Sequence, residues 1–257
     1  MIYRYLSKFS ISELLKQPLT FAYILIHIII ALLLSFINLK VVDSKIIGLT
    51  FFSFSFDEPY IINSIVSSFA GLVLWIFYFI IILIANKFWG ELVKNPLLDI
   101  ILTKTKSKRK IVFSGFIASF ILFIGPLFLL SIILIIIFYL NSNLLIINNL
   151  ITIIYYYSLL IIFITSLSFY LVQIFDEFFS SLAIILLLFF GGYLTSIYGI
   201  ASPFTDLINI FIPLKEFNSL LIRNIAGEHI FYHYIFFSTI VSFSFLWLGI
   251  KRFELET

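Results

Sequence analysis

Long runs of apolar residues constrain the fold of this 257-residue chain more than any other feature of its sequence. Several runs reach about 20 residues, the length that a helix needs to cross roughly 30 Å of hydrocarbon. The runs cover Leu19 to Leu39, Val66 to Asn86, Ile111 to Leu140, Leu144 to Ile174, Phe178 to about Ile200, and Ile230 to Ile250. Residues 1–257 are therefore predicted to form a single all-α integral membrane domain with six transmembrane helices.

The composition supports this class of protein. Apolar residues make up 62% of the chain and charged residues only 11%, whereas soluble domains carry about 25% charged residues. A soluble fold of this size lacks the polar residues to cover its surface, and the spans leave no room for a soluble catalytic module. The chain has no cysteine, which excludes disulfides, thiolate metal sites and cysteine nucleophiles.

Basic residues indicate the orientation in the membrane. Of the 16 lysines and arginines, four would lie in the loops on one side of a six-span protein, and these are Lys40, Lys45, Lys215 and Arg223. The others lie near the two termini or between the second and third spans. Because basic residues are enriched in cytoplasmic loops, both termini and the segment 87–110 are predicted to face the cytoplasm of a multi-pass protein.

Residues 1–17 have apolar side chains interleaved with basic ones. Ser10 and Glu13 have the spacing of a capping box, and Pro18 stops a helix. The pattern predicts an amphipathic helix lying in the inner membrane interface, followed by a sharp bend into the first span. A frayed cytoplasmic tail is the alternative.

The segment 87–110 is the part of the sequence that is densest in charge. Pro96 can begin a helix, whose apolar residues at positions 97, 98, 101 and 102 would share one face. Asp99 lies in its first turn and lysines follow its last, the order that a helix dipole favours. The positive-inside rule alone explains the lysines, but it does not explain the apolar face. A helix that docks into a groove on a partner explains both.

The stretch from Leu98 to Val112 resembles the cytoplasmic loop of type-2 ABC exporter permeases. Asp99 takes the acidic position of that loop, Ser107-Lys108 its Ser-Arg position, and Ile111-Val112 its Ile-Val pair. Thr105 departs from the usual proline, and Ser114-Gly115 stands where Gly-Lys is common. The resemblance implies a coupling helix that is seated on a nucleotide-binding subunit. The implied coupling residues are Glu91, Pro96, Leu97, Leu98, Asp99, Ile101, Leu102, Thr103, Lys104, Ser107 and Lys108.

A second resemblance covers the C-terminal third of the chain. The stretches Pro213 to Asn218, Arg223 to Glu228 and Gly249 to Arg252 resemble permeases of the gliding-motility-associated branch, whose relatives include permeases of nitrous-oxide-reductase maturation. This resemblance implies a bacterial cytoplasmic (inner) membrane location and a homodimer of permeases. It also implies two copies of an ABC ATPase subunit, contact with membrane lipid, and an accessory protein at the outer face.

Nucleotide chemistry is expected in the partner chain. The sequence contains no Gly-x-x-x-x-Gly-Lys-Ser/Thr phosphate-binding loop. The resemblance therefore implies that ATP and Mg are bound by the ATPase subunit, while this chain binds no cofactor or metal and catalyses nothing itself. No nucleic-acid partner is expected.

Residues 201–229 form the predicted outer segment between the last two spans. The apolar stretch from Phe204 to Leu214 is too short to cross a membrane and is bracketed by prolines. A re-entrant segment requires that its backbone be covered by protein or water, and an interfacial loop explains the stretch equally well. In either case Asp206, Lys215, Glu216 and Arg223 would lie at the outer rim.

Few polar residues interrupt the spans. His27 lies near the centre of the first span, where an ionisable residue is a functional candidate by default, although a neutral histidine can also bond a neighbouring helix. Asn148, Asn149 and Tyr156 in the fourth span would line a path or pack between helices. Gly125-Pro126 is expected to kink the third span.

Three classes of function remain open. The first is a permease subunit that couples ATP hydrolysis to export. The second is an ABC-type subunit that does mechanical work on an outer-face partner without a cargo. The third is an integral membrane enzyme, which needs a cluster of carboxylates or histidines. The third is disfavoured because the acids are scattered, at Glu13, Glu91, Asp99, Asp176 and Glu177.

Overall fold

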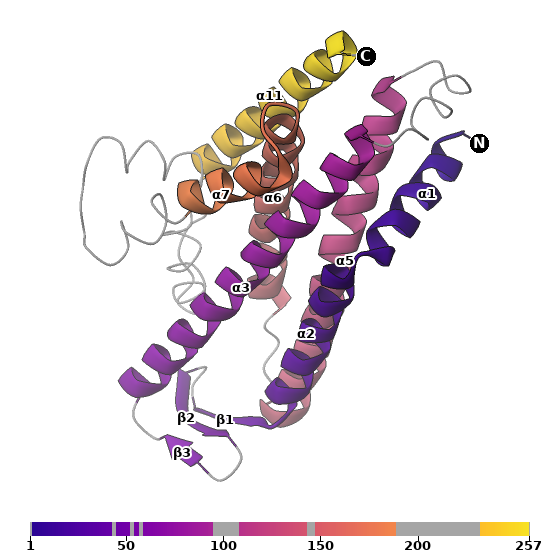
Figure 1. Cartoon of the computed structure of the whole chain (residues 1–257). Helices are drawn as coiled ribbons and strands as arrows, with labels where there is room; N and C mark the ends of the chain where they lie inside the picture. The colour runs from indigo at the N-terminus through magenta and orange to yellow at the C-terminus, as the bar shows by residue number, and fades with distance from the viewer. Residues whose placement is uncertain are drawn as a thin grey trace.

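A computed structural model describes residues 2–42, 45–51, 54–56, 59–94, 108–142, 147–188 and 232–256. Helices account for most of this part of the chain (Figure 1). Their bounds are α1 Ile2–Lys16, α2 Pro18–Ser35, α3 Pro59–Lys94, α5 Lys108–Ser142, α6 Ile147–Val172, α7 Glu177–Leu188 and α11 Tyr232–Glu256. The predominantly helical fold predicted from the apolar runs is confirmed.

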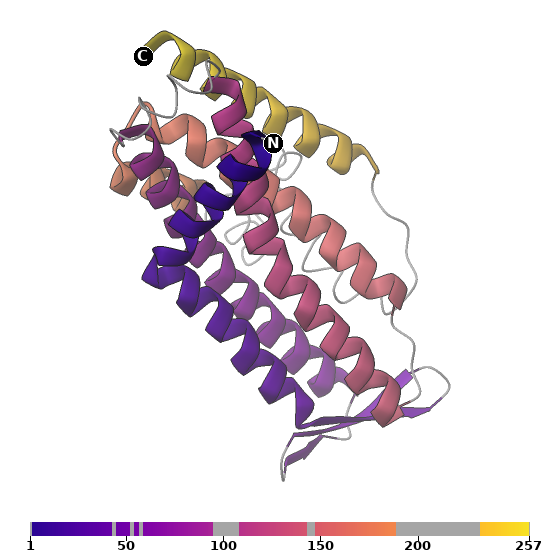
Figure 2. The same ribbon diagram turned by 90° about the vertical axis from the view of Figure 1, so that its right-hand side faces the viewer.

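The long helices form an elongated bundle. Helices α2, α3 and α5 run side by side, α6 packs against α3 and α5, and α11 packs along α6 (Figures 1 and 2). Both termini lie at the same end of the bundle, where α3 ends and α5 begins. We call this the charged end, defined by Lys94, Lys108 and Glu254.

A small sheet lies at the opposite end of the bundle (Figure 1). Strands β1 Ile37–Val42, β2 Lys45–Phe51 and β3 Phe54–Phe56 pair antiparallel in the order β1-β2-β3. The all-α prediction and the extension of the first span to Leu39 are therefore wrong in this region. Helix α2 ends at Ser35 because the residues that follow are rich in β-branched and aromatic side chains, which favour strands. A short apolar run does not by itself distinguish a strand from a helix.

The N-terminal helix meets the first long helix at a sharp elbow. The segments Phe9–Lys16 and Pro18–Leu33 are bent by 80° relative to each other, which confirms the predicted bend. Pro18 lacks an N–H and suits the first position of α2. The amide of Gln17 still donates to the carbonyl of Leu14 over 3.2 Å. Residues 2–16 are helical rather than a frayed tail, and the location of α1 in a membrane interface stays a prediction.

Two helical segments within the described residues are long and apolar enough to cross a membrane, Ile76–Lys94 and Lys108–Ile133. The bent pair α1–α2 gives a third if it is counted as one span. These segments indicate a membrane protein by length and composition, while the complete six-span topology stays a prediction. Helix α5 continues through Pro126 as one helix. The fifth predicted span is described only as α7, because residues 189–200 lie outside the described chain.

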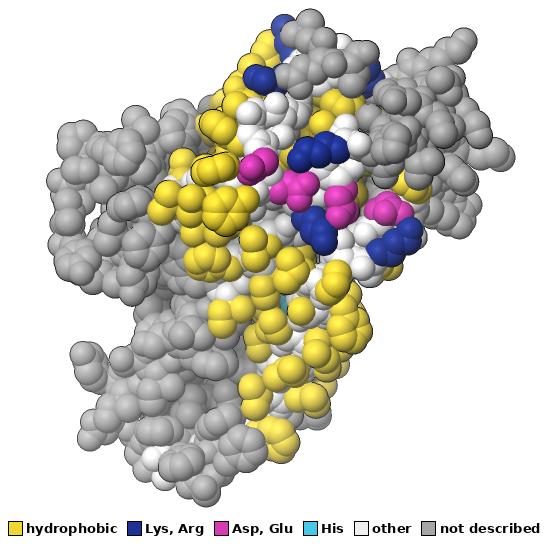
Figure 3. Space-filling model, in the orientation of Figure 1, with side chains coloured by type: hydrophobic (Ala, Val, Ile, Leu, Met, Phe, Trp, Pro, Cys, Tyr) yellow, Lys and Arg dark blue, Asp and Glu magenta, His cyan; other side chains and the backbone are white. Residues whose placement is uncertain are grey.

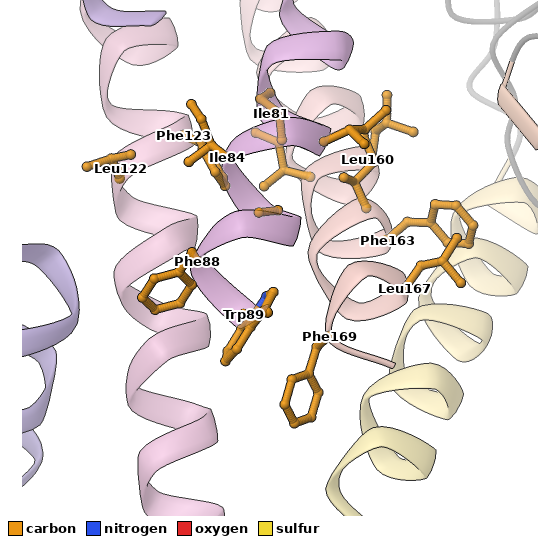
Figure 4. Packing of buried hydrophobic residues seen from close by; sticks show 14 of the residues in the cluster. Ile81, Ile84, Phe88, Trp89, Leu122, Phe123, Leu160, Phe163, Leu167 and Phe169 are labelled. Atoms are coloured by element: carbon orange, nitrogen blue, oxygen red, sulfur yellow. The ribbon is translucent and has the colours of Figure 1, made fainter. Parts of the chain in front are cut away.

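The core lies where α3, α5 and α6 meet (Figure 4). Its fully buried side chains include Ile81, Phe88 and Trp89 of α3, with Phe123 of α5 and Phe169 of α6. Lipid tails are as apolar as these side chains, so transfer from water contributes little within a bilayer. Close van der Waals packing between the helices stabilises this core instead.

Candidate functional site

Charged side chains gather at one end of the described structure. Magenta and blue side chains cluster over the upper part of the face in Figure 3, and hydrophobic ones cover the part below. Ion pairs here include Lys16–Glu13 at 2.6 Å, Lys87–Glu91 at 3.8 Å, Lys94–Glu177 at 3.8 Å and Arg109–Glu254 at 2.7 Å. The last two join different helices.

The predicted coupling segment connects two helices at this end. Helix α3 ends at Lys94 and α5 begins at Lys108, so the loop between them starts and finishes at the charged end. Most of the predicted coupling residues lie outside the described chain, namely Pro96, Leu97, Leu98, Asp99, Ile101, Leu102, Thr103, Lys104 and Ser107. The structure does describe Glu91 and Lys108, which flank the loop.

The end of α3 is tied to the start of α7. Lys94 approaches Glu177 across the two helices, while Glu91 pairs with Lys87 one turn back on α3 itself. Gly90 permits the close approach of α7, because a Cβ atom at this position would collide with the Glu177 side chain. Exposed pairs such as these stabilise a fold only weakly, so the Lys94–Glu177 pair marks where α3 and α7 meet and contributes little to holding them together.

The start of α5 is tied to the end of α11. Arg109 donates to Glu254 through Nε (2.7 Å to Oε1) and Nη2 (3.2 Å to Oε2), the bidentate geometry that guanidinium groups favour. Lys108 Nζ donates to the backbone carbonyls of Phe253 and Glu254, at 3.3 and 3.1 Å. These carbonyls lie in the last turn of α11, where intrahelical donors run out. We call this set of contacts the α5–α11 clamp.

The clamp depends on the charge of Glu254. The Arg109 guanidinium lowers the pKa of the Glu254 carboxyl below its ordinary value of 4.5. A lowered pKa in the folded state means that the ion pair stabilises the fold above pH 4.5 and is lost as the pH falls through the lowered value. The clamp is therefore fully formed at neutral pH.

An aromatic cluster lies beneath the charged side chains. The Trp89 ring is 4.7 Å from Phe169 and 5.0 Å from Phe88, and Phe169 is 6.2 Å from Phe253 (Figure 4). Two glycines make this packing possible. A Cβ atom at Gly115 would lie 3.0 Å from the Trp89 ring, and one at Gly249 would lie 2.7 Å from the Phe169 ring. The cluster joins α3, α5, α6 and α11 into one packed unit at the charged end.

His27 lies in a separate buried cluster between α2, α3 and α5. Its ring is stacked on Phe77, with centroids 4.0 Å apart and planes 7° apart, and only 3% of the residue is exposed. Its Nδ1 lies 2.9 Å from the Tyr23 carbonyl, so Nδ1 carries the proton and donates. The Tyr23 hydroxyl donates to the carbonyl of Phe123 over 2.7 Å. Of the two roles considered for His27, helix packing is the one with observed contacts.

This packing role predicts the outcome of a substitution. His27→Phe keeps the stack on Phe77 and removes a buried polar group together with its one hydrogen bond, an exchange that is often nearly neutral. We expect the free energy of unfolding in detergent micelles to change by less than about 1 kcal/mol. His27→Ala, which removes the stack, is the contrasting variant. Loss of transport with unchanged stability in His27→Phe would instead show that the imidazole acts in a path.

The structure does not describe the side chains of the remaining predicted site residues. Asn148, Asn149 and Tyr156 belong to α6, but the structure describes only their backbone. The outer-rim residues Asp206, Lys215, Glu216 and Arg223 lie outside the described chain. Over the described ranges, no group of three or more histidine, cysteine, aspartate or glutamate side chains is placed to hold a metal ion.

Comparison with protein-family models, with curated proteins and with solved structures gives no match for this chain. The function proposed below therefore depends on the motifs of the chain and on the geometry of the charged end.

Proposed function

We propose that this chain is the transmembrane permease subunit of an ABC transporter complex in the bacterial cytoplasmic membrane. A separate nucleotide-binding subunit, present in two copies, would bind ATP and Mg and dock on the 95–107 loop from the cytoplasm. A second permease copy would complete a homodimer. The chain itself would couple ATP hydrolysis to export or to conformational work, without a catalytic site of its own.

One observation carries this proposal. Both ends of the 95–107 loop are tied to helices other than α3 and α5, since Lys94 pairs with Glu177 of α7 and Lys108–Arg109 bind the end of α11. A force on the loop would reach four helices through these contacts. The buried cluster around Trp89 and Phe169 would then carry the displacement to α6. If the basic residues of this loop served only to orient the chain in the membrane, the loop would not need contacts with α7 and α11.

A second candidate is a mechanical subunit without a cargo that acts on a partner at the outer face. The three-stranded sheet favours it, because this sheet gives the end opposite the charged end a folded surface on which a partner protein could be seated. Transport of a cargo and work on an outer partner both require the same coupling loop. The two candidate functions differ in whether a partner protein bound at the sheet end copurifies with the chain.

Affinity purification of the chain from its native membrane in mild detergent tests the proposal. We expect recovery of an ATP-binding subunit that bears a phosphate-binding loop, and an additional outer-face protein if the second candidate is correct. Recovery of the chain alone, even after cross-linking through the lysines between Lys104 and Lys110, would contradict the docking of an ATPase on the 95–107 loop.

The α5–α11 clamp gives a further prediction for the assembled complex. Glu254→Gln removes the carboxylate to which the Arg109 guanidinium donates two hydrogen bonds. The sequence of the 95–107 loop stays unchanged. We expect the ATPase subunit to bind as before, while transport per ATP hydrolysed falls by up to about fivefold, because an exposed pair contributes at most about 1 kcal/mol and the Lys108 contacts still join α11 to α5. The measurement is ATP hydrolysis and transport in the same proteoliposomes.

Glu13→Gln is the matched control for the clamp variant. It removes a carboxylate of α1, the helix that carries the N-terminus at the same end of the bundle (Figure 1), and one that pairs with Lys16 within α1 itself. Equal losses of coupling in the two variants would show that charge at this end matters and the connection to α11 does not.

A further inference from the structure

An open groove runs along one face of α11. The groove is shallow, and its described lining, all from α11, is Thr239, Ile240, Phe243, Ser244 and Trp247. Positions 240, 243, 244 and 247 share a helix face. Phe243 and Trp247 are 58% and 55% exposed, so the groove is presented to the surroundings of the helix.

A cation lies at the charged end of this groove. Lys251 follows Trp247 by one helical turn, and its Nζ lies 4.0 Å from the centre of the Trp247 ring. Lys87, Lys94 and Arg109 each have a carboxylate partner, whereas Lys251 has no carboxylate within ion-pair distance among the described residues. Glu254, one turn further on, is engaged by Arg109, and the Lys251 charge acts on its carboxyl only from beyond ion-pair distance. The Lys251 ammonium is thus held over an aromatic ring with its charge available to an anion.

The groove wall offers little hydrogen bonding to an occupant. The Ser244 hydroxyl donates to the carbonyl of Ile240 over 2.8 Å, so its proton is already used within the helix. The other long side chains are apolar or aromatic. From Thr239 to Lys251 the groove and its cation extend over roughly 18 Å at 1.5 Å per residue. The occupant must therefore be thin and apolar along most of this length and anionic at one end.

We propose that this groove binds the acyl chain of an anionic phospholipid, whose phosphate contacts Lys251. Tryptophan and lysine are the residues that anchor helices at the boundary between hydrocarbon and headgroups, and here they stand one turn apart at the charged end of an apolar groove. A protein helix in the same place would leave the Lys251 ammonium against an apolar surface unless it brought its own acid. The lipid supplies the apolar chain and the anion together, and this inference does not depend on the proposed ATPase partner.

Quenching of tryptophan fluorescence by brominated lipids tests the site on the full-length chain in lipid nanodiscs. The chain has three tryptophans, and the difference between the unmodified protein and Trp247→Phe isolates the emission of Trp247. We expect phosphatidylglycerol with brominated acyl chains to compete about fivefold better for contact with Trp247 than brominated phosphatidylcholine, the preference that one lysine near an anionic headgroup supplies. In Lys251→Gln the two lipids should quench equally.

Lys16→Gln is the matched control. It removes a cation of α1 that pairs with Glu13 within that helix and that does not belong to the described lining of the α11 groove, so this variant should retain the preference for phosphatidylglycerol. Equal quenching by the two lipids in the unmodified protein would overturn the site as one for anionic lipid. A preference that survives in Lys251→Gln, or that is also lost in Lys16→Gln, would overturn the role of Lys251. No quenching by either lipid would show that protein, and not lipid, covers the groove.

Discussion

Replacing Leu98 and Leu102 together by aspartate should abolish the coupling of ATP hydrolysis to transport in the complex while leaving the chain inserted in the membrane. Both leucines belong to the apolar face predicted for the helix that begins at Pro96. Each buried leucine stabilises a docked surface by about 1.5–3 kcal/mol. Loss of both would weaken docking of the ATPase by at least about 100-fold, at 1.4 kcal/mol per factor of ten.

The opposite face of the same helix provides the matched control. In the predicted helix Ile100 would project away from Leu98 and Leu102 at 100° per residue, so Ile100→Asp, compared with Leu98→Asp alone, makes the same charge change without touching the docking face. This control should keep the ATPase bound and coupled. Since the chain has no cysteine, a single added cysteine reports insertion of each variant by its accessibility to a membrane-impermeant thiol reagent. Normal ATPase binding in the Leu98–Leu102 variant would overturn the coupling-helix assignment.

Replacing Gly249 by leucine should give the largest loss of stability of any single substitution proposed for this chain. A Cβ atom at Gly249 would lie 2.7 and 2.9 Å from two ring carbons of Phe169. That ring is fully buried and packed against Trp89, so it has little room to move. Overpacking of this kind costs about 1–3 kcal/mol, and we expect leucine to reach the upper end because its side chain adds further atoms to the same contact.

Gly125 is the control for this substitution. A Cβ atom at Gly125 meets no tertiary neighbour within 4 Å, but the following Pro126 disfavours the helical conformation for a residue that carries a Cβ, which offsets the gain of about 0.5–1 kcal/mol that alanine gives over glycine in a helix interior. Gly249→Ala should therefore lower the free energy of unfolding, while Gly125→Ala should leave it nearly unchanged, as measured by denaturant titration in mixed micelles. A neutral Gly249→Ala would mean that α6 and α11 pack less tightly than the structure indicates.

The apolar runs of the sequence predict the long helices well, but they do not predict where the first helix gives way to a strand. The third apolar run, Ile111 to Leu140, lies within α5 Lys108–Ser142, because an uninterrupted run of this length has no stable alternative to a helix in a membrane. The predicted first span extends too far, because the apolar residues after Ser35 are β-branched or aromatic and lie in β1. Asn38 and Lys40 interrupt the apolar run there, and this is the signal in the sequence that places the end of α2 earlier.

The contacts of the charged end could not be read from the sequence. In the sequence Arg109 is one member of a basic run, and Glu254, its partner, lies 145 residues away. Nothing local to either residue predicts the pair. Gly249 and Phe169 are likewise distant in the chain. A glycine in an apolar run does not indicate which aromatic side chain packs against it. Such pairs depend on how the helices are arranged in space, which single-sequence patterns do not specify.

The length of α3 has a mechanical consequence. Its 36 residues form a rod of roughly 54 Å at 1.5 Å per residue, well beyond the roughly 30 Å of a hydrocarbon core. One end lies beside the 95–107 loop and the other beside the three-stranded sheet (Figure 1). If α3 pivots about its charged end, each degree of tilt moves the sheet end by about 1 Å. A rearrangement of a few degrees at the charged end would thus be amplified into a displacement as large as a side chain at the sheet end.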